Sequence, residues 1–275
     1  MPTVRGFSFL TDYRKLVLAG IASLGFIMAQ PARAAYTLDV PFVPTPYEVV
    51  DRMLEIAQVG PDDHVIDLGS GDGRIAIAAV RKYGARSALG VDLNPERVAE
   101  ARANAESAGV SDKVEFREAD LFETDFSSAT VLTMYLLPDV NLALRDTILK
   151  LAPGTRVVSH AFDMDEWEAD VYERVDGRSV LMWVVPARVE GRWKLEGPDG
   201  VMQLDLQQQF QQISGTAGTA QATALPVSGS LNGAAIRLVV GEGDSARTFT
   251  GNVQGDSMLV APAGSMDTNW KGSRL

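Results

Sequence analysis

A glycine-rich turn near residue 70 has the residue types of a ligand-binding loop. The stretch 65–68 is apolar except for Asp67, and Gly69, Gly71 and Gly73 follow it. Glycine permits positive φ angles and lets the backbone come close to a ligand. A helical pattern begins directly after the glycines, so its free N–H groups would face ligand oxygens. A buried strand, a bare turn and a helix in this order are typical of a nucleotide-binding site.

The spacing of these glycines separates two kinds of nucleotide site. A dinucleotide fold has the pattern Gly-x-Gly-x-x-Gly, but here the third glycine comes one residue early and Arg74 stands in its place. The acid-x-Gly-x-Gly-x-Gly pattern that starts at Asp67 instead resembles motif I of class I S-adenosylmethionine-dependent methyltransferases. That cofactor has a cationic amino group and no pyrophosphate, which suits an acid beside an open turn. An NAD-dependent enzyme is the disfavoured alternative.

Two further acids end the next two strand patterns. Asp92 ends the pattern 87–92, and a carboxylate there can accept hydrogen bonds from both hydroxyls of a ribose. Asp120 ends the pattern 113–120, and by resemblance it takes the adenine amino group while Leu121 lies beside the ring. One such acid alone is more often a cap or a turn residue, but three in register favour a shared site. The resemblance implies this set of cofactor-binding residues: Asp67, Gly69, Gly71, Gly73, Asp92, Leu93, Asp120, Leu121 and Thr45.

A closer resemblance concerns the methyl acceptor. The stretches 41–46, 67–74 and 135–138 are similar to the protein-lysine methyltransferase family that modifies the ATP synthase c subunit. The resemblance implies that S-adenosyl-L-methionine is the cofactor and that a lysine in a protein is methylated. Four residues are candidates for the wall of the acceptor channel: Thr45, Tyr135, Asn141 and His160. We select Tyr135 and His160 as catalytic; the alternatives are a core tyrosine and a satisfied histidine at a strand end.

Alternating strand and helix patterns between residues 40 and 187 must position these residues. They predict an α/β sheet with helices on both faces, and the resemblance implies the seven-stranded Rossmann-like sheet of methyltransferases. Thr45-Pro46-Tyr47-Glu48 is typical of a capping box, with Thr45 as the N-cap of the first helix. Asn94-Pro95 predicts the start of a later helix in the same way. The other predicted elements are strands at 130–137 and 155–162, a helix at 140–151, and a hairpin of 171–175 with 179–185.

The chain changes character after residue 187. From 188 to 275 short alternating strands are separated by glycine-containing turns, which predicts a small antiparallel β-sandwich or barrel. Asn232-Gly233 is a hairpin signal between the strand patterns 227–231 and 235–240. The predicted domains are therefore a methyltransferase domain, residues 35–187, and a β domain, residues 188–275.

Residues 1–34 have the pattern of a secretory signal peptide. Arg14 and Lys15 precede a short apolar run, 16–29, and a small-x-small site ends at Ala34. The run is shorter than the roughly 20 residues that span a bilayer. We expect export, with the mature chain in the periplasm; the alternatives are a membrane anchor and a buried N-terminal helix. A location near a membrane is compatible with either targeting outcome.

The composition excludes several classes of function. Lys plus Arg is 25 and Asp plus Glu is 36, so the net charge is −11, which gives no general attraction for nucleic acid. The chain has no cysteine and only two histidines, so we expect no metal site, no disulfide and no cysteine nucleophile. The expected partner is a methyl-acceptor substrate, a protein, and no pattern specifies an oligomeric state. The alternative function is an exported binding protein that keeps the methyltransferase scaffold without catalysis.

Overall fold

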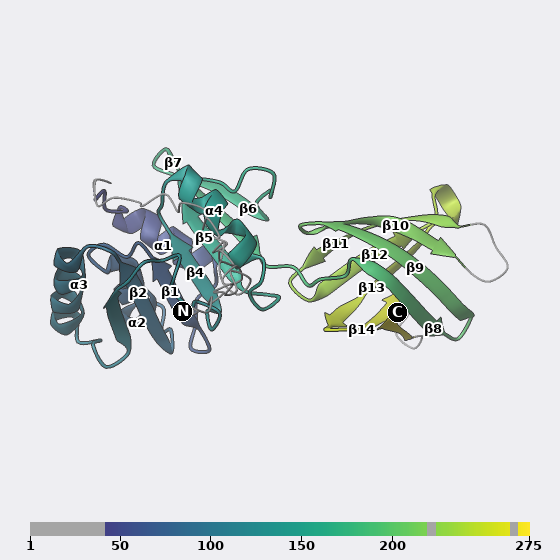
Figure 1. Ribbon diagram of the computed structural model, residues 1–275, viewed down its shortest axis with the longest axis horizontal. Helices are drawn as coiled ribbons and strands as arrows, with labels where there is room; N and C mark the ends of the chain where they lie inside the picture. Colours follow the sequence, from purple (N-terminus) through teal and green to yellow (C-terminus); the bar gives the residue numbers. More distant parts are fainter. Residues whose placement is uncertain (1–41, 219–223, 265–268) are drawn as a thin grey trace, which may run out of the picture. The chain divides into compact units, whose positions relative to one another are not determined.

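A seven-stranded mixed sheet lies within residues 64–184 of the computed structural model, which describes residues 42–218, 224–264 and 269–275 (Figure 1). The strand order is β3-β2-β1-β4-β5-β7-β6. Neighbouring strands are parallel except for the two pairs that β7 makes. The strands are β1 (His64–Leu68), β2 (Ser87–Asp92), β3 (Val114–Glu118), β4 (Val131–Met134), β5 (Arg156–His160), β6 (Val171–Val175) and β7 (Arg178–Val184). The predicted Rossmann-like sheet is confirmed.

Four helices cover the two faces of this sheet. They are α1 (Tyr47–Ile56), α2 (Arg74–Arg81), α3 (Pro95–Ala108) and α4 (Pro138–Ile148). Apolar residues of α1, α2 and α3 share one core with Val65 and Val131, whereas α4 shares a second core with Ile66 and Leu132. Because successive strand residues point to opposite faces, the central strands must be apolar on both sides. This double burial explains why β1 and β4 are nearly continuous apolar runs.

The strand order has a topological switch point at the carboxyl edge of the sheet. The chain runs outward from β1 through β2 to β3, and then returns to place β4 on the other side of β1. The connections that leave β1 and β4 therefore run to opposite sides of the sheet. Ligands of open α/β sheets bind at such a switch point. Thr45 precedes α1, and the other predicted cofactor residues lie at the carboxyl ends of β1, β2 and β3 or in the loops directly after them. Tyr135 and His160 are at the ends of β4 and β5.

The helix starts confirm one predicted cap and correct the other. Asn94 caps α3, since its side chain accepts from the backbone N–H groups of Glu96 and Arg97. The capping box predicted at Thr45 is wrong, because α1 begins at Tyr47 with Pro46 as its N-cap and has no side-chain cap bond. The Thr45 hydroxyl contacts the His160 ring instead. The local pattern predicted that the Thr45 hydroxyl caps α1, but in the folded protein this hydroxyl pairs with His160, a residue distant in the sequence.

Three predicted strands extend past the observed ones at their carboxyl ends. β4 ends at Met134 rather than at residue 137, and β5 ends at His160 rather than at residue 162. β3 ends at Glu118, so Asp120 lies in the loop that follows. The apolar residues past these ends leave the sheet, and Pro138 starts α4 as its first residue.

Eight antiparallel strands of the C-terminal region form a closed barrel (Figure 1). Each strand pairs with the next along the chain, and the last pairs with the first. The barrel core includes the buried rings of Trp193, Phe249 and Trp270. The predicted hairpin at Asn232-Gly233 joins two of the strands. The strands are β8 (Gly191–Gly197), β9 (Gly200–Gln209), β10 (Gln212–Gly218), β11 (Leu225–Asn232), β12 (Ala235–Val240), β13 (Arg247–Gln254), β14 (Ser257–Pro262) and β15 (Trp270–Arg274), with the 3₁₀ turn η1 (Gly243–Ser245) before β13.

The predicted domain limits can be compared only in part with these elements. The last strand of the sheet ends at Val184 and the first strand of the barrel begins at Gly191, so the limit predicted at 187 falls between them. The predicted signal peptide, residues 1–34, lies outside the described residues. Within the described part of the chain, none of the helices combines the length and apolar character needed to cross a bilayer.

Candidate active site

The glycine loop is tied to the end of β2 and is closely packed. The backbone N–H groups of Gly69 and Ser70 both donate to the Val91 carbonyl oxygen at 2.9 Å. Gly71 has a φ of +52°, and a Cβ atom there would lie 2.2 Å from Cε2 of Phe42. The Phe42 ring therefore leaves no room for a side chain at this position, and the positive φ favours glycine as well.

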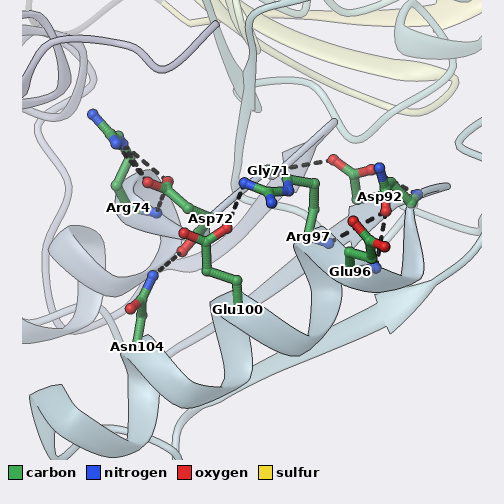
Figure 2. Close-up of polar contacts among 9 residues, drawn as sticks. Gly71, Asp72, Arg74, Asp92, Glu96, Arg97, Glu100 and Asn104 are labelled. Atoms are coloured by element: carbon green, nitrogen blue, oxygen red, sulfur yellow. Dashed lines mark hydrogen bonds and ion pairs between the residues drawn. The ribbon is translucent and has the colours of Figure 1, made fainter. Parts of the chain in front are cut away.

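Asp92 is held against this loop. Its Oδ2 accepts a hydrogen bond from the Gly71 backbone N–H at 2.9 Å, and its Oδ1 accepts from the Asn94 N–H at 2.9 Å (Figure 2). The structure therefore brings the acid of the second strand to the glycines of the first connection, as the sequence predicted. A carboxylate fixed in this way keeps further lone pairs for donors such as ribose hydroxyls.

Asp67 is a buried acid with one oxygen left unpaired. Its side chain is 1% exposed, Oδ1 accepts from the Thr133 hydroxyl at 2.7 Å, and Oδ2 has no hydrogen-bond partner. Burial raises the pKa of Asp67 to about 7, the Thr133 hydrogen bond opposes this rise, and the nearby charges of Asp92 and Asp72 add to it. A buried unpaired carboxylate oxygen is costly unless a ligand supplies a donor. The cationic amino group of S-adenosylmethionine fits that requirement.

Asp120 lies in the loop after β3, one strand further from the glycines. Its Oδ1 accepts from the Phe122 N–H at 2.8 Å, and the preceding Ala119 N–H donates to the Asp92 carbonyl oxygen at 3.1 Å. Leu121 packs on the core that faces α4, and Leu93 is 39% exposed. The structure thus places Asp120 beside the end of β2, and the adenine contacts assigned to Asp120 and Leu121 stay predictions.

Tyr135 and His160 lie together at the ends of β4 and β5. Their ring centroids are 4.0 Å apart, and the Phe162 ring stacks on Tyr135 at 6.2 Å. His160 is 3% exposed, and its Nδ1 lies 3.1 Å from the Thr45 hydroxyl. Burial, and to a smaller extent the charge of Arg178, lower the pKa of His160 to about 4. His160 is therefore neutral at pH 7.

The remaining two candidates for the acceptor wall have different surroundings. Thr45 contacts His160 and is buried, so it lies on the acceptor side, while the cofactor contact predicted for it stays a prediction. Asn141 is fully buried. Its amide nitrogen donates to the carbonyl oxygens of Phe162 at 3.2 Å and Asp163 at 3.3 Å. Asn141 thereby fastens the chain after β5 to α4.

Sequence reasoning missed one central residue, Arg74. Its Nε and Nη2 bind the Asp72 carboxylate (Figure 2). Its Nη1 donates to the Thr45 carbonyl oxygen at 2.9 Å. The sequence showed Arg74 only as a residue that stands where a dinucleotide fold needs glycine. No local pattern could reveal its contact with Thr45, because the partner lies 29 positions away.

Comparisons with known proteins identify the family. Residues 67–171 match the ANTKMT methyltransferase domain. A protein-lysine N-methyltransferase of Saccharolobus islandicus (strain REY15A) is 47% identical over 156 residues, which are 55% of this chain and 97% of that protein. The chain belongs to the protein-lysine N-methyltransferase family. A second relative, the adenine nucleotide translocase lysine N-methyltransferase of Mus musculus, is 35% identical over 145 residues, which are 52% of this chain and 62% of that protein.

A solved structure supports the assignment of the cofactor of this methyltransferase. An RNA methyltransferase from Salinibacter ruber, in complex with S-adenosyl-L-homocysteine, has 53% sequence identity and a TM-score of 0.52. The match covers 54% of this chain and 96% of that one. S-adenosylmethionine is therefore the cofactor, and the predicted class of enzyme is confirmed. A binding protein without catalysis, and an NAD-dependent enzyme, are not favoured.

Proposed function

We propose that this methyltransferase transfers a methyl group to the ε-amino group of a lysine in a protein. The observation that carries the proposal is the cluster of Tyr135, His160 and Thr45 at the ends of β4 and β5. β5 pairs with β4, and β4 pairs with β1, whose glycine loop and unpaired Asp67 oxygen fit the cofactor. Two of the relatives are named for lysine methylation, which supports the same acceptor.

The bound cofactor supplies a methyl group that its sulfonium already activates. The protein must then orient a lysine amine and deliver it without its extra proton. Orientation of reactants can account for roughly 7–11 kcal/mol of a barrier. A free lysine has a pKa of about 10.4, so neutralising it at pH 7 costs about 4.6 kcal/mol. The acceptor wall is built to reduce this second cost.

Aromatic rings and a neutral histidine favour the uncharged amine. The Tyr135 and Phe162 rings exclude water from one side, and desolvation lowers the pKa of an ammonium group. His160 is uncharged at pH 7, and the Tyr135 hydroxyl oxygen can accept a hydrogen bond from the amine. The lysine Nζ loses one proton to solvent, and its freed lone pair then forms the new N–C bond as the C–S bond breaks.

Labelled transfer to a peptide array tests this assignment. The protein is incubated with methyl-tritiated S-adenosylmethionine and an array of lysine-containing peptides, each paired with a copy in which arginine replaces lysine. Label should enter only the lysine copies, and acid hydrolysis should release labelled methyllysine. Tyr135→Phe should reduce transfer while leaving S-adenosylhomocysteine binding unchanged. Equal labelling of lysine and arginine copies would contradict the proposal.

RNA methylation is the second candidate function. The Salinibacter ruber protein, which shares 53% sequence identity with this chain, is named an RNA methyltransferase, and this name favours the second candidate. The net charge of −11 opposes it, because phosphate-rich partners are attracted to basic surfaces. The same labelled cofactor is therefore offered to total RNA, with and without ribonuclease. Ribonuclease-sensitive label together with unlabelled lysine peptides would replace the lysine proposal by the RNA one.

We infer that residues 1–34 direct export and that the mature enzyme is periplasmic or lies close to a membrane. The basic start, the short apolar run and the small-residue site support this inference. Cell fractionation with N-terminal sequencing tests it. A mature chain that begins at residue 35 in the exported fraction is expected. An intact N-terminus in the soluble cytosolic fraction would overturn it.

A further inference from the structure

Arg74 joins two parts of the site that are distant in the sequence. Its Nε lies 2.9 Å from Oδ1 of Asp72, and its Nη2 lies 2.5 Å from Oδ2. Its Nη1 points to the Thr45 carbonyl oxygen at 2.9 Å. One guanidinium thus holds a residue of the glycine loop and a residue of the segment that precedes α1. The planar fork of arginine can serve both partners at once, whereas a lysine ammonium acts as a point charge.

Both partners of Arg74 are themselves fixed. The Asp72 carbonyl oxygen accepts from the Asn104 amide of α3 at 2.9 Å (Figure 2). The Tyr47 ring covers the guanidinium, whose central carbon lies 5.0 Å from the ring centroid. Arg74 therefore has little freedom, and its geometry is passed on to Thr45.

Thr45 carries this restraint to the acceptor wall. Its backbone oxygen is held by Arg74, and its hydroxyl lies 3.1 Å from Nδ1 of His160. The contact gives Nδ1 of a neutral His160 a hydrogen-bond partner, and the threonine hydroxyl can serve there as donor or as acceptor. The His160 ring in turn contacts the Tyr135 ring, with the two ring planes inclined at 35°. A continuous series of contacts thus runs from Asp72 in the glycine loop to the aromatic wall.

We propose that Arg74 is a positioning residue that couples the glycine loop to the acceptor wall by holding Thr45 against His160. The proposal rests on the proposed function in one respect, namely that Tyr135 and His160 border the methyl acceptor. The coupling itself is a property of the protein alone. It can be measured without an acceptor, so the two ideas can fail separately.

Histidine NMR tests the coupling directly. His64 and His160 are the only two histidines in the chain, so long-range ¹H–¹⁵N spectra contain two imidazole systems. His64 contacts the Ser87 hydroxyl at the opposite end of the sheet and serves as an internal reference. In the wild type the ¹⁵N signal of His160 Nδ1 should be that of a hydrogen-bonded nitrogen. Arg74→Met should shift this signal without moving His64, and Thr45→Val should shift it in the same direction.

Matched variants keep the test decisive. Arg81→Met alters another arginine of α2, for which the described residues provide no hydrogen bond or ion pair, and it should leave the His160 signals unchanged. Arg74→Lys preserves the positive charge and replaces Arg74→Met in the test if the methionine variant does not fold. It should also shift the Nδ1 signal, because one ammonium cannot hold both Asp72 and Thr45. An unchanged Nδ1 signal of His160 in a folded Arg74 variant would overturn the proposal.

Kinetics with a peptide acceptor from the array extend the test. Arg74→Met should lower kcat by about tenfold, since the amine is less well oriented. The dissociation constant of S-adenosylhomocysteine should change by less than about threefold. An equal loss of cofactor affinity and of kcat would assign Arg74 to the cofactor loop alone and refute the coupling. If the wild type labels no lysine peptide, the proposed function fails, while the NMR result still decides the coupling.

Discussion

The buried carboxyl group of Asp67 makes a quantitative prediction about cofactor binding. Burial raises its pKa to about 7 in the ligand-free protein, so the group is largely protonated in mild acid. Its Oδ2 has no partner and is the atom that would meet the ammonium group of the ligand. If the ligand binds the ionised form, S-adenosylhomocysteine affinity must fall as the pH falls below 7, because binding then requires loss of a proton.

The size of this effect follows from the fraction of Asp67 that is ionised. With a pKa of about 7, that fraction is about 50% at pH 7.0 and about 3% at pH 5.5. The association constant should therefore be about sixteenfold higher at pH 7.0 than at pH 5.5. Over this range the α-amino group of the ligand remains protonated, because the adjacent carboxylate of a free amino acid favours the ammonium form. The change in affinity therefore reports the protein carboxyl group.

Titration calorimetry of the whole protein with S-adenosylhomocysteine at several pH values measures this dependence. Asp67→Asn should bind more weakly and show a flat profile between pH 5.5 and 7.0. Thr133→Val removes the hydrogen bond that favours the ionised form, so its profile should shift to higher pH. Asp139→Asn, at an exposed acid in the first turn of α4, is the matched control and should follow the wild type. A wild-type profile that is as flat as that of Asp67→Asn would refute the reasoning.

Three further predictions concern the loop, a helix and the barrel. Asp92→Ala should weaken S-adenosylhomocysteine binding by about 1.5–3 kcal/mol, because charge-assisted hydrogen bonds are lost; unchanged affinity in calorimetry would contradict the ribose assignment. Asn94→Ala should lower the free energy of unfolding by about 1 kcal/mol in urea denaturation, because two N–H groups of α3 lose their cap; an unchanged midpoint would speak against the cap. Deletion of 188–275 should leave a folded domain that binds S-adenosylhomocysteine, since the sheet is complete by Val184; an unfolded circular dichroism spectrum would show that the limit is misplaced.

Most of the fold could be predicted from the sequence because its signals are local. Strands buried on both faces need apolar runs, and the helices between them begin at recognisable caps such as Asn94-Pro95. The positions of Asp67 and Asp92 followed from the same logic, since acids at the ends of adjacent parallel strands must meet at one edge. The sequence predicted a barrel only as one of two alternatives, the other being a sandwich. Closure of the barrel depends on the pairing of β15 with β8, which no local pattern encodes.

The network around the acceptor wall could not be predicted for a related reason. Thr45 and His160 are 115 positions apart, and Thr45 had a plausible local role as a helix cap. The choice between these roles depends on what the folded sheet places beside the hydroxyl. Arg74 presented the same problem, because its type and position gave no hint of the backbone oxygen that it holds. At Thr45 and Arg74, contacts with distant residues therefore determine the role of the side chain more than the local sequence pattern does.

The order of the barrel strands has a consequence for the integrity of the protein. Seven of its eight pairings join strands that follow each other along the chain, and only β15 with β8 links its two ends. Removal of the final six residues, Trp270 onward, would leave β14 and β8 each with an unpaired side. Exposed strand sides of this kind recruit other chains. Proteolytic loss of these six residues would therefore open the closed barrel, and the two open strand edges would favour self-association of the protein.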